Sequence, residues 1–189
     1  MARQRLRPVW SPRALDGLYH QVHDYRGWRD HRLRVPLTGQ LAQWMVGEYG
    51  LTSAADLSCG EGAALDMVDL PSGSRFYGDL VPGHPYCGPI EKTLHEIPPV
   101  GMLICGETIE HLDDPDSFLA AARSRVGCLV VSTPVGSWND PTPGHYWAWD
   151  RVEVESMLSR AGFTADAYTE LSWPGDPRLP HTFGIWGCR

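Results

Sequence analysis

The 189-residue sequence lacks several features that would assign it to a particular class of protein. No apolar run approaches the roughly 20 residues that a membrane-spanning helix needs, and no apolar segment follows the N-terminal arginines as in a secretory signal. The five cysteines are odd in number and contain no Cys-x-x-Cys pair, which argues against a disulfide framework and a zinc cluster. We therefore expect a cytoplasmic protein that does not associate with membranes and forms one domain.

Positive charge is also scarce, and it is unevenly distributed. The formal net charge is −7, yet residues 1–34 carry eight arginines against three aspartates. Such a basic stretch could contact phosphate, or it could be a solvated extension. The acidic remainder argues against tracking a duplex, whereas contact with one RNA end needs few phosphate contacts.

The first 36 residues have no periodic apolar face. They are polar and interrupted by prolines, so we interpret residues 1–36 as a loose basic arm with one short helix near Arg13–Tyr25. We expect this arm to be dispensable for folding, and we assign residues 37–189 to the folded domain.

Strands alternate with helices along the rest of the chain. The patterns predict helices over 38–49, with Thr38 as the cap and Gly50 as the stop, over 115–125, after Asp114-Pro115, and over 150–161. They predict strands over 54–58, 75–78, 100–105, 127–133, 163–173 and 181–188. Residues 81–99 contain five prolines and are predicted to be a loop. This order indicates an α/β fold with one Rossmann-like, doubly wound sheet, mostly parallel, and a C-terminal antiparallel hairpin.

A glycine-containing turn follows the first predicted strand. It reads Asp56-Leu57-Ser58-Cys59-Gly60-Glu61-Gly62, and its two glycines let the backbone approach a ligand closely. The helix expected next would present free N–H groups to a carboxylate. The second strand ends at Asp79, and a carboxylate there can hold a vicinal diol with two hydrogen bonds.

Acidic and histidine side chains follow the third predicted strand. Glu107, Glu110 and His111 are spaced i, i+3 and i+4, which places them on one face of a helical turn. His145 lies in the loop after the adjacent strand and can reach the same edge of the sheet. Two glutamates and two histidines suit Mg²⁺ or Mn²⁺, with Zn²⁺ and Fe²⁺ not excluded. The alternative is a turn or pocket without metal, in which His111 or His145 would be the general base.

Taken in order, these motifs resemble those of the class I S-adenosylmethionine (SAM)-dependent methyltransferases. The shared landmarks are Asp-x-x-Cys-Gly-x-Gly, the acidic Asp79, the run Glu107-Thr108-Ile109-Glu110-His111-Leu112 and the phrase Val131-Ser132-Thr133-Pro134, and they cover about residues 38–189. The resemblance implies methyl transfer from SAM and implies a set of cofactor-binding residues: Asp56, Gly60, Gly62, Asp79, Leu80 and Gly106. Asp56 has a second interpretation, in which it only holds the turn through backbone amides.

A finer resemblance concerns the acceptor of the methyl group. The stretch STPVGSWND…GHYWAWDRVE is similar to that of the small-RNA 3′-terminal 2′-O-methyltransferases, which hold a metal on a ribose diol with two Glu and two His. The ubiquinone-biosynthesis O-methyltransferases share the E-x-x-E-H part and act on a catechol. The resemblance therefore implies a hydroxyl acceptor on a small molecule or on a sugar or ribose diol, with metal assistance. The alternatives are an RNA end and a non-catalytic binding or regulatory protein with the same fold.

The sequence departs from the family pattern in its first half. Ser58 stands where the family usually has glycine, and only 28 residues separate Asp79 from Glu107. The helix and strand that normally lie there must be short or missing. No acidic contact to the adenine amine is visible near Cys87-Gly88-Pro89, and the sequence does not reveal the oligomeric state.

Overall fold

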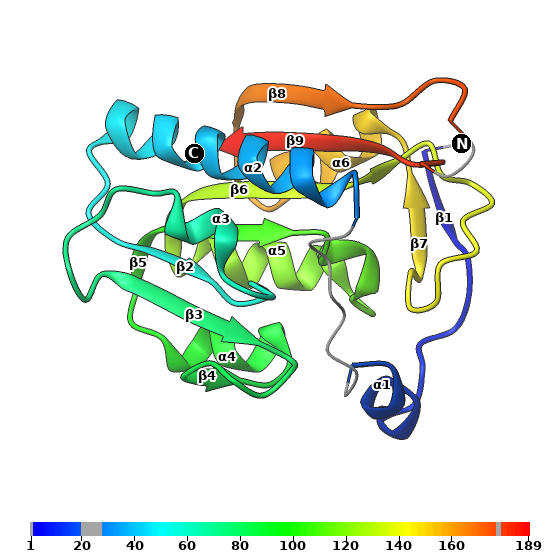
Figure 1. Ribbon diagram of the computed structural model, residues 1–189, viewed down its shortest axis with the longest axis horizontal. Helices are drawn as coiled ribbons and strands as arrows, with labels where there is room; N and C mark the ends of the chain where they lie inside the picture. The colour runs from blue at the N-terminus through cyan, green and yellow to red at the C-terminus, as the bar shows by residue number, and fades with distance from the viewer. Residues whose placement is uncertain (1, 20–27, 177–178) are drawn as a thin grey trace.

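The computed structural model describes residues 2–19, 28–176 and 179–189. Among these residues a seven-stranded sheet has the order β4-β3-β2-β5-β6-β9-β8 (Figure 1). Its strands are β2 (Ala54–Asp56), β3 (Arg75–Asp79), β4 (Tyr86–Cys87), β5 (Val100–Gly106), β6 (Val126–Val135), β8 (Ala165–Leu171) and β9 (Thr182–Cys188). β9 runs antiparallel to β6 and β8, and the other pairs are parallel. The expected mostly parallel sheet with a C-terminal hairpin is confirmed.

Helices cover both faces of this sheet. They are α2 (His31–Tyr49), α3 (Ala63–Asp66), α4 (Ile90–Glu96), α5 (Pro115–Arg123) and α6 (Arg151–Arg160). The alternation along β5 explains the two layers, because neighbouring strand residues point to opposite faces. Met102 packs with the core beneath α2 and α3, while Leu103 packs with the core beneath α4, α5 and α6. A strand that is buried on both faces reads as one apolar run, as β5 and β6 do.

The helix ends follow from local residues. The Asp114 carboxylate accepts a hydrogen bond from the Ser117 N–H at 3.0 Å, and the Asp150 carboxylate accepts one from the Glu153 N–H at 2.9 Å. Each satisfies a backbone donor that the first turn of a helix leaves free. Gly50 ends α2 in the left-handed conformation, at φ 60°.

Two predictions from proline and threonine positions are wrong. Helix α2 begins at His31 rather than Thr38, and the Thr38 hydroxyl donates to the Arg34 carbonyl inside the helix instead of capping it. Pro36 lies within α2, near its start, where it lacks the N–H that would donate to the preceding turn. Residues 81–99 hold β4 and α4, because their prolines flank these short elements. The elements expected there are thus short, not missing.

The described part of the N-terminal segment packs against the domain. Strand β1 (Arg3–Arg5) pairs antiparallel with β7 (Trp147–Trp149) in a second, two-stranded sheet, and α1 (Pro12–Tyr19) follows. The rest of the helix expected near Arg13–Tyr25 lies outside the described residues. The boundary expected at residue 36 falls inside α2, and residues 2–19 do not form a loose arm. Within the described ranges, no helix is both long enough and apolar enough to cross a bilayer.

Candidate functional site

The glycine turn (Asp56–Gly62) connects β2 to α3. Gly60 and Gly62 have φ angles of 55° and 84°, which side chains rarely adopt. A Cβ at Gly62 would lie 3.1 Å from the Tyr77 ring, whereas none of the described atoms lies within 4 Å of a Cβ placed on Gly60. The side of the turn at Gly60 is therefore open to a ligand. Helix α3 has only four residues, so it contributes less dipole than the expected full helix would.

Asp79, at the end of β3, is bound to this turn. Its Oδ2 accepts a hydrogen bond from the Gly60 N–H at 2.7 Å, and its Oδ1 accepts one from the Val81 N–H at 2.9 Å. Leu80 follows with 37% of its surface exposed. Three of the residues expected to bind cofactor, Gly60, Asp79 and Leu80, thus lie together at the end of two neighbouring parallel strands.

Asp56 is buried behind the turn. Its Oδ1 accepts a hydrogen bond from the Ser58 N–H at 3.2 Å. Burial raises the pKa of Asp56 to about 7, with the charge of Asp79 adding to the effect. Because its carboxylate points into the turn's own backbone, the structure favours a role in holding the turn. The Ser58 and Thr108 hydroxyls are 2.7 Å apart, so the departure from glycine at 58 links the turn to the segment after β5.

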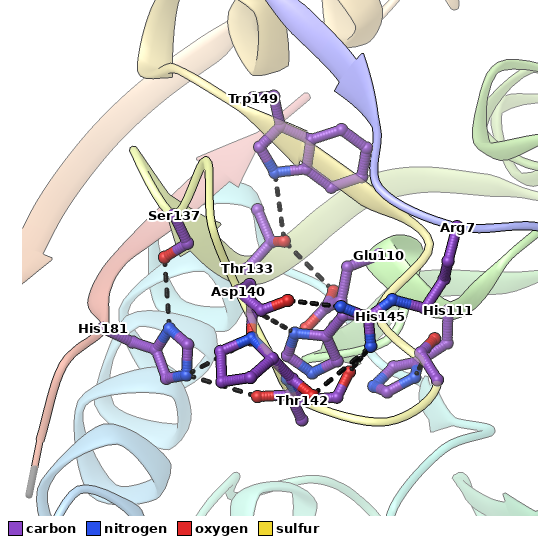
Figure 2. A network of polar contacts seen from close by, with 12 residues as sticks. Arg7, Glu110, His111, Thr133, Ser137, Asp140, Thr142, His145, Trp149 and His181 are labelled. Carbon is purple, nitrogen blue, oxygen red and sulfur yellow. Dashed lines mark hydrogen bonds and ion pairs between the residues drawn. The ribbon is translucent and has the colours of Figure 1, made fainter.

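Glu110, His111 and His145 converge at the ends of β5 and β6, and we call them the Glu-His-His cluster (Figure 2). Glu110 and His111 lie on a short 3₁₀ helix, η2 (Ile109–His111), and His145 lies in the loop between β6 and β7. One ligand atom of each residue lies within 4.8 Å of the others, and the imidazole ring centroids are 4.6 Å apart. The Tyr146 N–H donates to the Glu110 carbonyl at 2.8 Å and thereby fixes the loop against η2.

Hydrogen bonds assign the ring nitrogens of both histidines. His111 Nδ1 lies 2.9 Å from the Gly144 carbonyl and 3.2 Å from the Tyr19 hydroxyl. His145 Nδ1 lies 2.6 Å from the carboxylate of Asp140. Because a carbonyl and an ionised carboxylate only accept, Nδ1 carries the proton in both rings. In the neutral rings, Nε2 then has the lone pair that a metal ion or a substrate proton would meet.

The third member, Glu110, is 1% exposed, and only one of its two carboxylate oxygens has a hydrogen-bond partner among the described residues. Its Oε2 accepts a hydrogen bond from the Thr133 hydroxyl at 3.0 Å, and Thr133 in turn accepts one from the Trp149 indole at 3.2 Å (Figure 2). Its Oε1 is buried and has no hydrogen-bond partner among the described residues. An unpaired buried carboxylate oxygen is costly and points to a missing ligand.

The pKa shifts reflect the burial and crowding of ionisable groups in the cluster. Burial, followed by the charge of Glu107, raises the pKa of Glu110 to about 8. Burial also lowers the pKa of His111 to about 3, with His145 adding to the effect. The pKa of His145 is raised, because the hydrogen bond to Asp140 and the charge of Glu110 outweigh its burial. A neutral imidazole at His111 and excess negative charge around His145 together suit a divalent metal ion.

Glu107 is not among the residues whose ligand atoms lie within 4.8 Å of one another, although its charge acts on both Glu110 and His145. It adopts φ 50°, and its Oε1 accepts a hydrogen bond from the Ser132 hydroxyl at 2.8 Å and lies 3.8 Å from Arg34. The i, i+3 spacing assumes a helical turn from Glu107 onward, but η2 begins only at Ile109. Gly106, expected to contact the cofactor, is the last residue of β5 and is partly exposed.

Comparisons with known proteins find similar solved structures but no matching sequence. No protein-family model and no curated protein sequence matches the chain. The solved 1,6-didemethyltoxoflavin-N1-methyltransferase of Burkholderia thailandensis, with S-adenosylhomocysteine bound, superimposes with a TM-score of 0.63 at 13% identity, over 97% of this chain and 92% of that chain. The magnesium protoporphyrin IX methyltransferase of Synechocystis, also with S-adenosylhomocysteine, gives 0.61 at 14% identity, over 94% and 93%. A SAM-dependent methyltransferase of Clostridium acetobutylicum gives 0.59 at 10% identity, over 94% and 96%.

The chain has the fold of the SAM-dependent methyltransferases. In such an α/β sheet, ligands bind beyond the carboxyl ends of the parallel strands. The glycine turn, Asp79 and the Glu-His-His cluster all lie at that edge of this methyltransferase fold, after β2, β3, β5 and β6. The open space at Gly60 and the half-buried Asp79 carboxylate lie next to each other at this edge.

Several residues in the polar network were not expected from the sequence. Asp140 and Thr133 hold His145 and Glu110, and Tyr19 reaches His111 from α1. Asp140 carried a usable signal, because it is an acidic residue five positions before a candidate ligand in the same loop. Thr133 lies within the recognised Ser-Thr-Pro phrase, whereas Tyr19 gave no signal, because nothing local indicates that α1 returns to the site.

Proposed function

We propose that this protein is a SAM-dependent O-methyltransferase whose acceptor is a vicinal diol on a small molecule or sugar. The observation that carries the proposal is the unpaired, buried Oε1 of Glu110 beside two imidazoles whose Nδ1 atoms already have hydrogen-bond partners. This set lies at the same strand ends as the glycine turn and is joined to it through the hydrogen bond between Thr108 and Ser58.

On the cofactor side, the chain supplies backbone and one carboxylate. The turn at Gly60 would accommodate the amino-acid end of SAM, and Asp79 would accept from its ribose hydroxyls. Each carboxylate oxygen of Asp79 already accepts one backbone N–H and keeps a second lone pair for a hydroxyl. Asp56 would hold the turn in place through its hydrogen bond from the Ser58 N–H.

On the acceptor side, Glu110, His111 and His145 would hold a divalent ion such as Mg²⁺ or Mn²⁺. The two oxygens of the diol would chelate such an ion, and the pKa of one hydroxyl would fall as a result. The task of the chain is to hold the acceptor oxygen in line with the sulfonium methyl group at near-attack distance. Without metal, His145 is better suited than His111 as general base, because its pKa is raised and that of His111 is lowered.

The N-terminal arginines favour a small acceptor over an RNA end. Arg3 pairs with Asp116, Arg5 pairs with Asp113 at 2.6 Å, and Arg7 donates to backbone carbonyls of the loop after β6. Arginines that are engaged within the protein are less available to phosphates. Arg3, Arg5 and Arg7, which belong to the basic stretch that suggested phosphate contact, are thus engaged within the protein.

Methyl transfer from radiolabelled SAM tests the proposal. The acceptors would be a catechol, a nucleoside with a free 2′,3′-diol and an RNA with a terminal diol, each with its deoxy counterpart as control. We expect transfer to a free small diol, loss with a chelator and recovery with Mn²⁺. Transfer that needs only a single hydroxyl, or that is insensitive to chelator, would contradict the diol–metal part. Failure to bind SAM at about 1 mM would contradict the whole proposal.

A further inference from the structure

We propose that Asp140 is a positioning residue that fixes the His145 ring with Nε2 facing Glu110 and His111, and that Arg7 holds the loop that carries Asp140. The inference rests on the proposed function, since it concerns how one proposed metal ligand is oriented. It assigns a role in the site to a side chain of the N-terminal segment, about 130 residues away in sequence.

Among the cluster residues, Asp140 hydrogen-bonds His145. Its side chain is 2% exposed, and its Oδ2 lies 2.6 Å from His145 Nδ1. Its Oδ1 accepts a hydrogen bond from the Thr142 N–H at 2.7 Å and lies 3.8 Å from His181 Nε2. The Asp140 carboxylate therefore accepts from the His145 imidazole through one oxygen and from the loop backbone through the other.

An accepting carboxylate at Nδ1 determines the state of the other nitrogen. It stabilises the Nδ1–H tautomer, turns the lone pair of Nε2 toward the cluster and prevents the ring from flipping. Carboxylates in this position raise the basicity of a metal-bound imidazole, and removing them typically weakens metal binding by about 10–100-fold. Gly144 does the equivalent for His111 with a backbone carbonyl.

Arg7 determines where Asp140 lies. Its two terminal nitrogens donate to the backbone carbonyls of Asp140 and Thr142, and Nη1 also lies 3.4 Å from the Pro141 carbonyl (Figure 2). Next to it, the Leu6 N–H donates to the Tyr146 carbonyl at 2.8 Å. Three successive carbonyls facing one guanidinium leave the loop little freedom, because the fork of donors in arginine is planar and rigid.

The test compares Asp140→Asn and Arg7→Met with two matched controls. Asp113→Asn removes the same charge from an exposed pair with Arg5, and Arg151→Met removes an arginine from an exposed pair with Glu155 on α6. Histidine-selective ¹⁵N NMR of the metal-free proteins would report the His145 tautomer, with His145→Gln identifying its signals. Calorimetry would give the dissociation constants for Mn²⁺ alone and for SAM.

In wild type and both controls, we expect His145 to carry its proton on Nδ1. Asp140→Asn should shift His145 toward the Nε2–H form and weaken Mn²⁺ binding by about 10–100-fold, with SAM affinity within about twofold. Arg7→Met should weaken Mn²⁺ binding by less, about tenfold, because Arg7 acts on the proposed ligand His145 only through the loop that carries Asp140. If Asp140→Asn does not fold, Arg7→Met carries the same test, because it leaves the Asp140 side chain in place.

The metal-free spectra separate this inference from the proposed function. A wild-type His145 that carries its proton on Nε2, or a tautomer unchanged in Asp140→Asn, would overturn the role of Asp140. Mn²⁺ binding by Arg7→Met equal to wild type would overturn the role of Arg7. A wild type that does not bind Mn²⁺ but shows the expected tautomer shift would refute the metal site and leave the positioning of His145 intact.

Discussion

The two halves of the site are built in different ways. On the cofactor side, backbone groups make most of the contacts: the Gly60 and Val81 amides donate hydrogen bonds to Asp79 at a partly exposed turn. On the acceptor side, buried side chains orient one another, and Glu110 and His145 each depend on a dedicated partner. A backbone site tolerates sequence change around it, whereas a side-chain network loses function when any one member is removed.

We therefore expect a substitution in one half of the site to impair ligand binding in that half alone. Apart from the Ser58 contact to Thr108, the glycine turn uses hydrogen bonds made within about 25 residues of chain, while the Glu-His-His cluster uses contacts from η2, the loop before β7 and residues 2–19. A variant that damages one half should leave ligand binding at the other unchanged. The four predictions below test that separation.

We expect the largest effect from Glu110→Gln. The substitution removes the charge of the one carboxylate in the cluster and should abolish measurable Mn²⁺ binding and lower methyl transfer at least about 100-fold. SAM affinity should stay within about twofold, as measured by calorimetry. Glu91→Gln, an exposed position on α4, serves as control. Full activity of Glu110→Gln would remove the cluster from the acceptor site.

Asp79→Ala should produce the converse result. Losing a carboxylate that can accept from the ribose hydroxyls should weaken SAM binding by about 10–100-fold, since hydrogen bonds to charged groups contribute about 1.5–3 kcal/mol. Mn²⁺ affinity should not change. Asp69→Ala removes an exposed aspartate nearby and should bind SAM like wild type. A parallel loss of Mn²⁺ binding would show that the halves are coupled.

Removing residues 1–27 should have an intermediate effect. SAM binding should stay within about threefold, since the hydrogen bonds of Asp56, Ser58 and Asp79 are made within residues 56–108. Mn²⁺ affinity should fall about tenfold, because the truncation removes the Tyr19 contact to His111 and the Arg7 contacts to the loop. A protein that no longer folds would show that β1 is part of the core instead.

Asp56→Asn should affect the site least and the pH dependence of stability most. Burial raises the folded-state pKa of Asp56 to about 7, well above that of an exposed aspartate, so its contribution to stability is greatest at low pH and is lost as pH rises through 7. A shift of this size corresponds to up to about 4 kcal/mol at 1.36 kcal/mol per pKa unit. Denaturant unfolding from pH 4 to 8 should show a flatter profile for Asp56→Asn. Identical profiles would contradict the burial argument.

The sequence predicted the parts of the fold that depend on local signals. The strand before the glycine turn, the acidic end of β3, the caps at Asp114 and Asp150 and the C-terminal hairpin all appear where expected. The predicted start of α2 was wrong because Thr38 and Pro36 resemble boundary signals. Helix packing overrides these local signals, and α2 continues through both residues. The prolines of 81–99 were over-interpreted, because prolines beside an element do not interrupt it.

The site was predictable only where its residues are close in sequence. Glu110 and His111 are adjacent, and His145 follows the neighbouring strand, so their meeting could be inferred from strand order. Glu107 was harder to place, because its backbone conformation depends on the tertiary environment of Ser132 and Arg34. The contributions of Arg7 and Tyr19 depend on β1 pairing with β7, a contact across more than 140 residues for which no local pattern exists.

A crystal structure with S-adenosylhomocysteine and Mn²⁺ tests the central claim most directly, because anomalous scattering locates the metal. We expect the sulfur beside the glycine turn, the ribose hydroxyls on Asp79, and one Mn²⁺ at about 2.0–2.3 Å from a Glu110 oxygen and from Nε2 of His111 and His145. Open coordination positions should face the sulfur. A structure with the cofactor in place and no anomalous density at Glu110, His111 and His145 would contradict the account.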